Sequence, residues 1–412
     1  MNKPSTSSCK NRSCAVCGSV DPEVLFRRRF LGMSGAGLLS GYDVSACKTC
    51  GFCYADHLPS RDEFDAYYEQ QSKYEHDYRS LALSEFDLRN RPFAAGIISD
   101  WIPDRDARIL DIGCAAGGLL AELKRRGYNN LLGLDPSPAC ARAAKEMHGI
   151  EVMTAPLSKI PRKIGSFDLV IFGSVLEHLP DLNETADLVR NLLNPGGCVH
   201  IEVPDMSRCS LMEDAPYQEF SLEHINYFSP VSLRNLWEKH GFHPAGMRQT
   251  EIVQTPGLTL YEIKAMFRLG AGESAARFEP DNVTKPELER YIQRSRTKEE
   301  RISRIIDALV EERKPLIVWG VGTHTQGLMA GTRLGETDIR AFVDSNTRYA
   351  GKNINRIPVV STDSLRELPH DILVSSHQFQ GEIVDQIRNR LKLGNGIITL
   401  YQTAPLPLPE IG

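Results

Sequence analysis

Short apolar runs alternate with amphipathic helical patterns between residues 107 and 247. The apolar runs, which we expect to be strands, read ARILDIG, NLLGLD, FDLVIFGS and CVHIEVP. The segments between and after them place apolar residues at helical spacing and read GLLAELKRRG, PACARAAKEM, DLNETADLVRNLL and SPVSLRNLWEKHG. This alternation predicts an α/β fold built on a parallel, doubly wound sheet.

The pattern changes on both sides of this region. Apolar and aromatic residues at helical spacing predict a helical segment before it, and the stretch at 250–283 is expected to be irregular. A long charged helix is expected at 284–313, followed by a second, smaller α/β unit. We therefore expect five parts: a cysteine-bearing module at 1–60, a helical lid or linker at 61–100, the core at 101–250, a bridge and long helix at 251–313, and a Rossmann-like C-terminal domain at 314–412.

Composition and charge exclude several classes of protein. Of the 412 residues, 41% are hydrophobic and 25% are charged, as in an ordinary globular protein. The formal net charge of −5 argues against a protein that wraps nucleic acid or coats an anionic membrane. No apolar run reaches the ~18 residues of a spanning helix, and the first residues lack the apolar core of a signal peptide, so we expect a cytoplasmic protein. The oligomeric state is left open.

Six of the ten cysteines lie within the first 53 residues. Two CxxC pairs are separated by 29 residues, and each is followed by a glycine, Gly18 or Gly51, where a knuckle turn needs a residue without Cβ. Four thiolates on two such knuckles can close a tetrahedral site, so the spacing predicts a structural Zn²⁺ held by Cys14, Cys17, Cys47 and Cys50. Zinc knuckles that bind RNA are disfavoured, because the chain is acidic and this region lacks dense basic and aromatic residues.

A loop of small residues follows the first expected strand of the core. It runs from Asp111 through Gly113 to Gly117 as DxGxxxG, which lets the backbone approach a ligand at the carboxyl end of the strand. The GxGxxG pattern that favours a pyrophosphate is absent from it. The next expected strand ends at Asp135, 22 residues after Gly113, where a carboxylate can accept hydrogen bonds from both hydroxyls of a ribose.

Four segments, LDIGCAAGGLL, LGLDPS, FDLVIFGSVLEHL and LLNPGGCVHIEVP, resemble the class I S-adenosylmethionine-dependent methyltransferases in order and spacing. The resemblance covers about residues 107–205 and implies a transferase that binds S-adenosyl-L-methionine in a Rossmann-like core. It implies that the Gly113–Gly117 loop borders the methionine moiety, that Asp135 holds the ribose, and that Ala155 and Pro156 lie near the adenine. The implied cofactor-binding residues are Asp111, Gly113, Ala115, Gly117, Asp135, Ala155, Pro156, Phe172, Gly173 and Ser174.

A Glu-His pair follows the fourth core strand. Glu223 and His224 lie shortly before the helix-start signal Ser229-Pro230, and an imidazole in this connection can accept a proton near neutral pH. A purely structural role, in which the ring packs under the helix, remains open for His224. The same alternative is open for His178, which follows the cofactor-binding segment. Tyr67, Tyr68, Tyr74 and Tyr78 either form part of a lid over the cofactor or pack their helix onto the core.

The whole chain is similar to the zinc-ribbon methyltransferases that include the sugar-nucleotide C-methyltransferases of deoxysugar biosynthesis. In that family a Y-H-E-H segment, followed by an aromatic residue and a serine, carries the base. Glu223 and His224 match its last two residues, whereas Ser221 and Leu222 stand at its first two. The resemblance implies a small activated substrate, a nucleotide-linked sugar, methylated on carbon with His224, Glu223 and His178 as catalytic residues. An O- or N-methyltransferase for a natural product or a surface-polysaccharide sugar remains the alternative.

The C-terminal unit begins with a strand, a glycine-rich turn and a helix. Asp344 ends its next strand, 22 residues after Gly322, which resembles a dinucleotide fingerprint in a unit too short for a complete dinucleotide site. Three interpretations stay open: the unit holds the nucleotide or sugar part of the substrate, shapes the cleft or an oligomer contact, or binds a redox dinucleotide. His324, His377 and Gln378 are its candidate ligand contacts.

Overall fold

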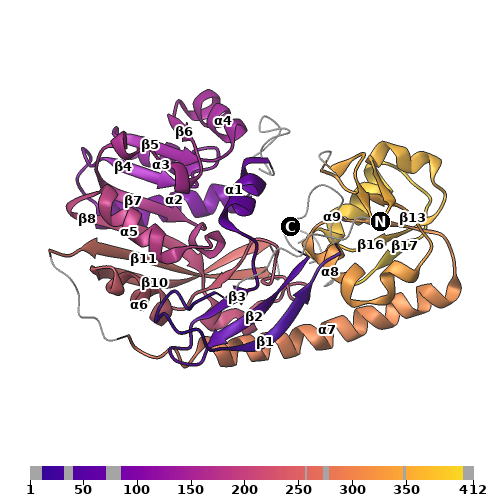
Figure 1. Ribbon diagram of the computed structural model, residues 1–412. Helices are drawn as coiled ribbons and strands as arrows, with labels where there is room; N and C mark the ends of the chain where they lie inside the picture. The colour runs from indigo at the N-terminus through magenta and orange to yellow at the C-terminus, as the bar shows by residue number, and fades with distance from the viewer. Residues whose placement is uncertain are drawn as a thin grey trace, which may run out of the picture. The chain divides into compact units, whose positions relative to one another are not determined.

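The computed structural model describes residues 12–31, 40–70, 85–255, 258–271, 278–346 and 349–401 (Figure 1). The chain forms two compact units, and each is discontinuous in sequence. Unit 1 takes its described residues from 12–26, 43–212 and 223–290, and unit 2 takes its own from 27–42, 213–222 and 291–401. No helix among these residues is long and apolar enough to cross a membrane.

Unit 1 is built on a seven-stranded sheet with the order β10-β11-β8-β7-β4-β5-β6. The strands from β8 to β6 are parallel, and β10 and β11 run antiparallel at one edge. The order along the chain reverses between the neighbours β4 and β7, which makes their carboxyl ends the expected ligand position. The strands are β4 (Ile109–Ile112), β5 (Leu131–Asp135), β6 (Val152–Thr154), β7 (Phe167–Gly173), β8 (Leu193–Pro204), β10 (Phe242–Thr255) and β11 (Leu258–Leu269).

Helices cover both faces of this sheet because alternate residues of each strand point to opposite sides. Leu110 and Ile112 of β4 share a core with α5 (Leu182–Leu192) and α6 (Pro230–Lys239). Ile109, on the other face, packs with α2 (Glu85–Trp101), α3 (Gly118–Arg125) and α4 (Pro138–His148). The helix α6 begins where expected, with Pro230 in its first turn and a reciprocal capping box between Ser229 and Ser232.

The stretch at 250–283 was expected to be irregular, and this expectation is wrong over most of its length. Residues 250–255 and 258–269 belong to β10 and β11, a long antiparallel hairpin that completes the sheet. The periodicity is obscured because β11 buries the charged Lys264 between the apolar Ile263 and Ala265. The edge strand β10 is largely polar and so lacks a clear apolar face.

A second, smaller sheet of order β1-β2-β3-β9 carries the cysteine module. Its strands are β1 (Pro22–Arg29), β2 (Gly41–Cys47), β3 (Cys53–Asp56) and β9 (Asn226–Tyr227). Because β3 pairs with β9, the module is hydrogen-bonded to the segment that directly follows Glu223 and His224. The short helix α1 (Arg61–Gln70) follows β3 along the chain.

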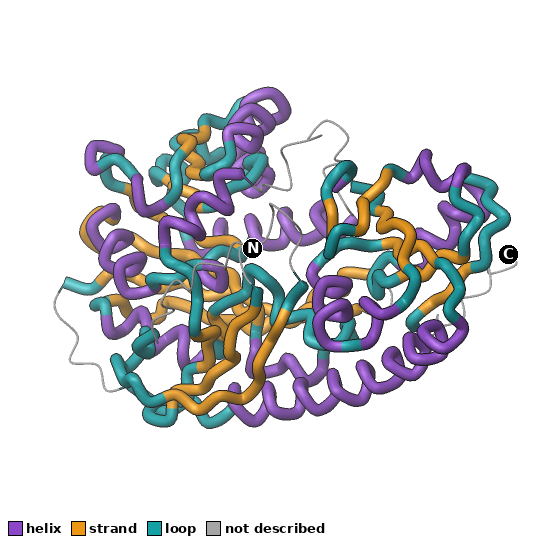
Figure 2. The backbone as a smooth tube through the Cα atoms, turned by 45° about the vertical axis from the view of Figure 1, so that its right-hand side comes forward, coloured by secondary structure: helices purple, strands orange, loops and turns teal. Residues whose placement is uncertain are grey.

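Unit 2 contains a six-stranded sheet whose strands lie among helices and loops (Figure 2). The strand order is β14-β15-β13-β12-β16-β17, and the sheet is parallel except for the β14–β15 pair. The strands are β12 (Leu316–Trp319), β13 (Ile339–Val343), β14 (Asn353–Ile354), β15 (Ile357–Val360), β16 (Asp371–Val374) and β17 (Ile397–Thr399). Ile302 and Ile306 of α7 (Thr284–Glu312) and Leu328 of α8 (Thr323–Gly331) cover one face. Ile383 of α9 (Gln380–Asp385) belongs to the core on the other face. The structure therefore has a long charged helix at Thr284–Glu312, followed by a second set of alternating strands and helices.

Short turns of 3₁₀ helix connect several of these elements. They lie at Leu157–Lys159, Arg162–Ile164, Leu176–His178, Met206–Leu211, Arg333–Glu336 and Thr362–Glu367.

Candidate active site and cysteine centre

The loop after β4 adopts a backbone that only small residues tolerate well. Gly113, Ala115 and Gly117 have φ values of 73°, 47° and 72°. A Cβ on Gly113 would lie 2.5 Å from Cγ2 of Val175, so glycine is required there by conformation and by space. The loop can therefore bring its backbone close to a ligand at the carboxyl end of β4.

Asp135 fastens this loop to the end of β5. Its Oδ2 accepts the backbone N–H of Ala115 at 2.9 Å, and its Oδ1 accepts that of Ser137 at 2.9 Å. Burial raises the pKa of Asp135, while these two backbone donors counteract that effect. A side-chain hydrogen bond with Cys140 also lowers that pKa, so three donors already use the four lone pairs of the carboxylate and at least one lone pair is left for a hydroxyl.

The other predicted cofactor residues gather at the same sheet edge. The backbone N–H of Ala155 donates to the carbonyl oxygen of Asp135 at 3.2 Å, which brings Ala155 and the following Pro156 beside that carboxylate. Gly173 ends β7, and Ser174 after it has a φ of 57° and donates its backbone N–H to the carbonyl oxygen of Glu202 at 2.9 Å. Phe172 differs from these residues, because its side chain is fully buried in the core. The Gly113–Gly117 loop, Asp135, Ala155, Pro156, Gly173 and Ser174 therefore lie at the carboxyl ends of the neighbouring strands β4, β5, β6 and β7, and we call this set the rim.

Asp111 lies within β4 rather than on the loop and is buried. Burial, reinforced by the nearby carboxylates of Glu202 and Asp135, raises its pKa well above its usual range. Glu202 is held in the opposite state: burial would raise its pKa, but Lys264 and His200 outweigh burial and lower that pKa to about 2. Nζ of Lys264 lies 2.6 Å from Glu202. This buried ionic network below the rim has no recognisable signal in the sequence.

Beyond the rim, two histidines and two glutamates from different segments meet. The ligand atoms of Glu177, His178 and His224 all lie within 4.8 Å of one another, and the rings of His178 and His224 have centroids 5.1 Å apart. Nδ1 of His178 lies 3.0 Å from the carbonyl oxygen of Glu223. Since a carbonyl oxygen only accepts, Nδ1 carries the proton of the neutral ring and Nε2 keeps its lone pair. The cluster can accept a proton from a substrate, or it can ligate a cation.

Two tyrosines of α1 complete this cluster. Oη of Tyr67 donates to Oε1 of Glu223 at 3.0 Å, and the Tyr68 ring meets His178 edge-on with centroids 6.2 Å apart. The Tyr68 hydroxyl is buried and has no hydrogen-bond partner among the described residues. Burial, followed by the nearby Glu223, raises the pKa of Tyr68 well above its usual range, so this hydroxyl stays protonated. Tyr74 and Tyr78 lie outside the described residues.

The sequence singles out His178, Glu223 and His224 as catalytic candidates. It places Glu177 beside His178, just beyond the cofactor-binding segment, and Tyr67 in a possible lid over the cofactor, but it gives neither residue a catalytic role. Tyr67 lies 156 residues from Glu223 and carries only the general signal of an aromatic residue on an expected helix.

The segment that bears His224 is held from two sides. The backbone N–H of Ile225 donates to the carbonyl oxygen of Glu177 at 2.8 Å, and the carbonyl oxygen of Ile225 accepts the N–H of Ala55 at 2.9 Å. Arg12 adds side-chain hydrogen bonds to the carbonyl oxygens of Ala55 and Pro180, both at 2.8 Å. The cysteine module therefore positions the Glu223-His224 segment.

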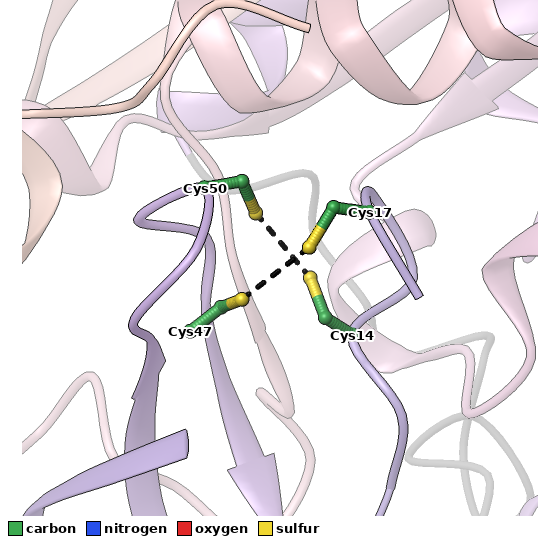
Figure 3. Close-up of side chains that lie close together, drawn as sticks. All are labelled: Cys14, Cys17, Cys47 and Cys50. Carbon is green, nitrogen blue, oxygen red and sulfur yellow. Dashed lines mark hydrogen bonds between the residues drawn. The ribbon is translucent and has the colours of Figure 1, made fainter. Parts of the chain in front are cut away.

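The four predicted metal-binding cysteines converge, with their sulfur atoms facing one another (Figure 3). The Sγ atoms of Cys14 and Cys50 are 3.4 Å apart, as are those of Cys17 and Cys47, and all four thiols are free. Tetrahedral Zn–S bonds of about 2.3 Å require S–S distances of about 3.8 Å, so the donor set matches a Cys₄ zinc site closely. A hydrogen bond from Cys50 lowers the pKa of Cys14 to about 5, and the same contact raises that of Cys50.

The knuckle glycines adopt the expected geometry. Gly18 and Gly51 have φ values of 78° and 79°, and each donates its N–H to the carbonyl oxygen of the first cysteine of its pair, at 2.8 Å and 2.9 Å. A Cβ on Gly51 would lie 2.0 Å from the carbonyl oxygen of Asp281, whereas one on Gly18 would meet no described atom within 4 Å.

Comparison with known proteins agrees with this geometry. A model of the family described as "Methyltransferase domain" matches residues 45–244, which include the rim and the histidine cluster. The C-methyltransferase NovU of Streptomyces niveus is 26% identical over 318 residues, which cover 74% of this chain and 73% of that protein. The chain is an S-adenosylmethionine-dependent methyltransferase. It has the α/β Rossmann-like core that the resemblance in the sequence predicts.

Other matches cover smaller parts of this methyltransferase. The ubiquinone biosynthesis O-methyltransferase of Ralstonia nicotianae is 28% identical over 171 residues, covering 37% of this chain and 71% of that protein. Residues 312–396 match a family model described as "C2185-like, N-terminal". Among solved structures, the 1,6-didemethyltoxoflavin-N1-methyltransferase of Burkholderia thailandensis with bound S-adenosylhomocysteine is 20% identical, with a TM-score of 0.40. It covers 54% of this chain and 97% of that one.

Proposed function

We propose that this methyltransferase methylates a carbon atom of a nucleotide-linked sugar and that His224 is the general base. The observation that carries the proposal is the cluster of His178, His224, Glu177 and Glu223 next to the cofactor rim. The similarity to a C-methyltransferase supports it, because that similarity extends over 74% of the chain and thus well beyond the methyltransferase domain.

The rim fits S-adenosylmethionine by its own chemistry. The side chain of Val175 occupies the space that a Cβ on Gly113 would need. Asp135 can still accept a hydrogen bond at the end of the second strand. No described atom lies within 4 Å of the position that a Cβ on Gly173 would take. Bound S-adenosylmethionine supplies an electrophilic methyl group. The chain has to hold the acceptor in line with that group and remove a proton from it.

Transfer to carbon makes the base indispensable, because a C–H acceptor must lose its proton at or before the transition state. An imidazole can accept a proton near neutral pH, so the side chain of His224 suits this role. His178, with its proton fixed on Nδ1 by the carbonyl oxygen of Glu223, offers Nε2 as a second acceptor beside it. Tyr67 donates to Glu223 and so holds that carboxylate in place.

Zn²⁺ belongs to the proposal as a structural ion held by Cys14, Cys17, Cys47 and Cys50. Four thiolates leave no open position for a substrate, so the ion would take no part in the chemistry. Its role would be to fix the module whose strand β3 pairs with β9 and thereby positions His224.

O-methylation is the second candidate, and the ubiquinone O-methyltransferase relatives favour it. An acceptor hydroxyl would use the same base. These relatives match little more than the methyltransferase core, and the Ralstonia nicotianae protein covers 37% of the chain. They therefore say nothing about the cysteine module or unit 2, and we prefer methylation of carbon.

The test combines a substrate screen with a matched pair of variants. Nucleotide sugars are incubated with the protein and S-adenosylmethionine labelled in the methyl group, and transfer is followed by mass. With the substrate found, His224→Ala should lower turnover by ~10²-fold or more while leaving cofactor affinity nearly unchanged. His243→Ala, an exposed histidine on β10, is the control. Near-normal turnover of His224→Ala would place the base elsewhere, with His178 as the next candidate.

A further inference from the structure

The cluster of Glu177, His178 and His224 has the ligand set of a transition-metal site as well as that of a base. It offers two imidazoles and one carboxylate, and the ligand atoms all lie within 4.8 Å of one another. Imidazole nitrogens suit zinc, copper, iron and nickel, whereas Mg²⁺ and Ca²⁺ prefer oxygen ligands. Three side-chain ligands also leave a further coordination position open, unlike the four thiolates of the cysteine centre.

The spacing of these ligand atoms is close to what one ion needs. Nε2 of His178 lies 3.8 Å from Oε1 of Glu177, which is too long for a hydrogen bond. Bonds of about 2.0–2.1 Å to zinc place two tetrahedral ligands about 3.4 Å apart. The widest separation in the cluster therefore has to close by at most about 1.4 Å. Both histidines are partly exposed, so an ion can reach them from solvent.

The ring of His178 already has the orientation of a metal ligand. Its Nδ1 donates to the carbonyl oxygen of Glu223 at 3.0 Å, so the lone pair is on Nε2, the nitrogen that faces Glu177. In metal sites a ligating histidine almost always donates its other N–H to a carbonyl, a carboxylate or water, which fixes both the tautomer and the ring. No rearrangement of the proton on His178 is needed before an ion binds.

The backbone that carries the three ligands is also tied together. The N–H of Ile225 donates to the carbonyl oxygen of Glu177 at 2.8 Å. Nδ2 of Asn226 donates to the carbonyl oxygen of Leu179 at 2.8 Å. These bonds join the turn that bears Glu177 to the segment that bears His224. An ion would find its ligands largely assembled, which reduces the entropy lost on binding.

A buried hydroxyl beside the cluster points to a further ligand there. Oη of Tyr68 is buried and has no hydrogen-bond partner among the described residues. The ring of Tyr68 meets that of His178 edge-on, with centroids 6.2 Å apart. A buried hydroxyl left without a partner is costly. A water molecule in the open coordination position of an ion would accept the hydrogen bond that this hydroxyl offers.

We propose that Glu177, His178 and His224 bind a divalent transition-metal cation such as Zn²⁺ and that this ion inhibits methyl transfer. The cause of the inhibition is competition for one electron pair, because an imidazole nitrogen that ligates an ion cannot accept a proton. The inhibition rests on the proposed function, in which His224 is the base, whereas the binding of the ion does not. The site is distinct from the Cys₄ site and uses none of its residues.

Co²⁺ is a suitable probe, because its visible absorption depends on the atoms that ligate it. Full-length protein without a histidine tag is loaded with zinc at the cysteines, freed of excess metal and titrated with Co²⁺. We expect one Co²⁺ per chain, with the weak absorption of nitrogen and oxygen ligation and without the intense absorption of thiolate ligation. Glu177→Gln and His178→Ala should each weaken Co²⁺ binding at least about tenfold. His243→Ala, which removes an exposed histidine on β10, is the matched control and should leave binding unchanged.

The inhibition is measured on methyl transfer to the substrate found in the screen. Turnover by the wild type should fall at least about tenfold when Co²⁺ saturates the site, and it should recover when a chelator removes the Co²⁺. Glu177→Gln should need at least about tenfold more Co²⁺ for the same fractional inhibition. Thermal melts of each variant show whether it is folded.

Two results would overturn the metal site: no Co²⁺ bound outside the cysteine centre, or binding that is equally tight in Glu177→Gln and His178→Ala. Saturation of the site without loss of turnover would overturn the inhibition. Failure of the methyl-transfer proposal has a different signature. His224→Ala would then turn over normally, whereas the Co²⁺ titration, which contains neither substrate nor cofactor, would still show the site.

Discussion

Replacing Gly113 by alanine should damage the cofactor loop in two separable ways. At a φ of 73° an alanine costs about 1–2 kcal/mol relative to glycine. Its Cβ would also lie 2.5 Å from Cγ2 of Val175, a contact that overpacks the turn by about 1–3 kcal/mol because a β-branched side chain cannot easily rotate away. Together the free energy of unfolding should fall by about 2–5 kcal/mol, and the affinity for S-adenosylhomocysteine should fall with it.

A double-mutant cycle with Val175→Ala separates the two parts. Removing Cγ2 leaves Cβ of Val175, at 3.7 Å, as the nearest of the three contacts, so the clash disappears while the backbone strain stays. Urea denaturation should therefore give a favourable coupling of about 1–3 kcal/mol between the two substitutions. Calorimetry on the same proteins should show that the double variant regains part of the lost affinity. If Gly113→Ala is equally damaging with Val175 and with Ala at position 175, the close packing of the loop on Val175 is not the reason for the glycine.

Three further predictions concern the metal, the cofactor and pH. Wild-type protein should contain about one zinc per chain, and Cys14→Ser should lose it and melt at a lower temperature; zinc content that is unaffected by this substitution would contradict the Cys₄ site. Asp135→Ala should weaken cofactor binding by ~1.5–3 kcal/mol in calorimetry, whereas unchanged affinity would mean that Asp135 does not hold the ribose. Burial and the nearby Glu219 raise the pKa of Asp214 from its ordinary 3.8 to about 8, so the folded protein keeps a proton that the unfolded chain releases. Stability should then fall between about pH 4 and pH 8, by at most ~1.4 kcal/mol per pH unit, and Asp214→Asn should remove this slope in thermal melts while the exposed Asp363→Asn should not.

The parts of the fold that the sequence predicts are those in which local and tertiary preferences agree. The parallel strands are buried on both faces and read as continuous apolar runs, as in FDLVIFGS, so they are recognised without tertiary information. The hairpin of β10 and β11 is missed because Lys264 sits in the core, where Glu202 and Glu262 pair with it at 2.6 Å and 2.9 Å. The buried charge of Lys264 is tolerated only because these two carboxylates pair with it. One of them lies on another strand, and the other lies two residues away along the same strand.

The candidate site shows the same division. Gly113, Asp135 and the CxxC pairs can be recognised in the sequence, because a glycine turn, a strand-end carboxylate and paired thiols are local patterns. The meeting of His178 with His224 is not local, because it depends on the hydrogen bonds that join Ile225 to Glu177 and to Ala55. The sequence names both histidines separately, but only the fold brings them together with Glu177 and Tyr67.

The most direct test of the account is the identity of the atom that receives the methyl group. The protein is incubated with S-adenosylmethionine carrying a ¹³C-labelled methyl and with the nucleotide sugar found in the screen, and the product is analysed by NMR. The account predicts a labelled methyl coupled to a ring carbon of the sugar, formed by the wild type and at least ~10²-fold more slowly by His224→Ala. A labelled methyl bonded to oxygen or nitrogen, or the same product formed at an undiminished rate by His224→Ala, would contradict it.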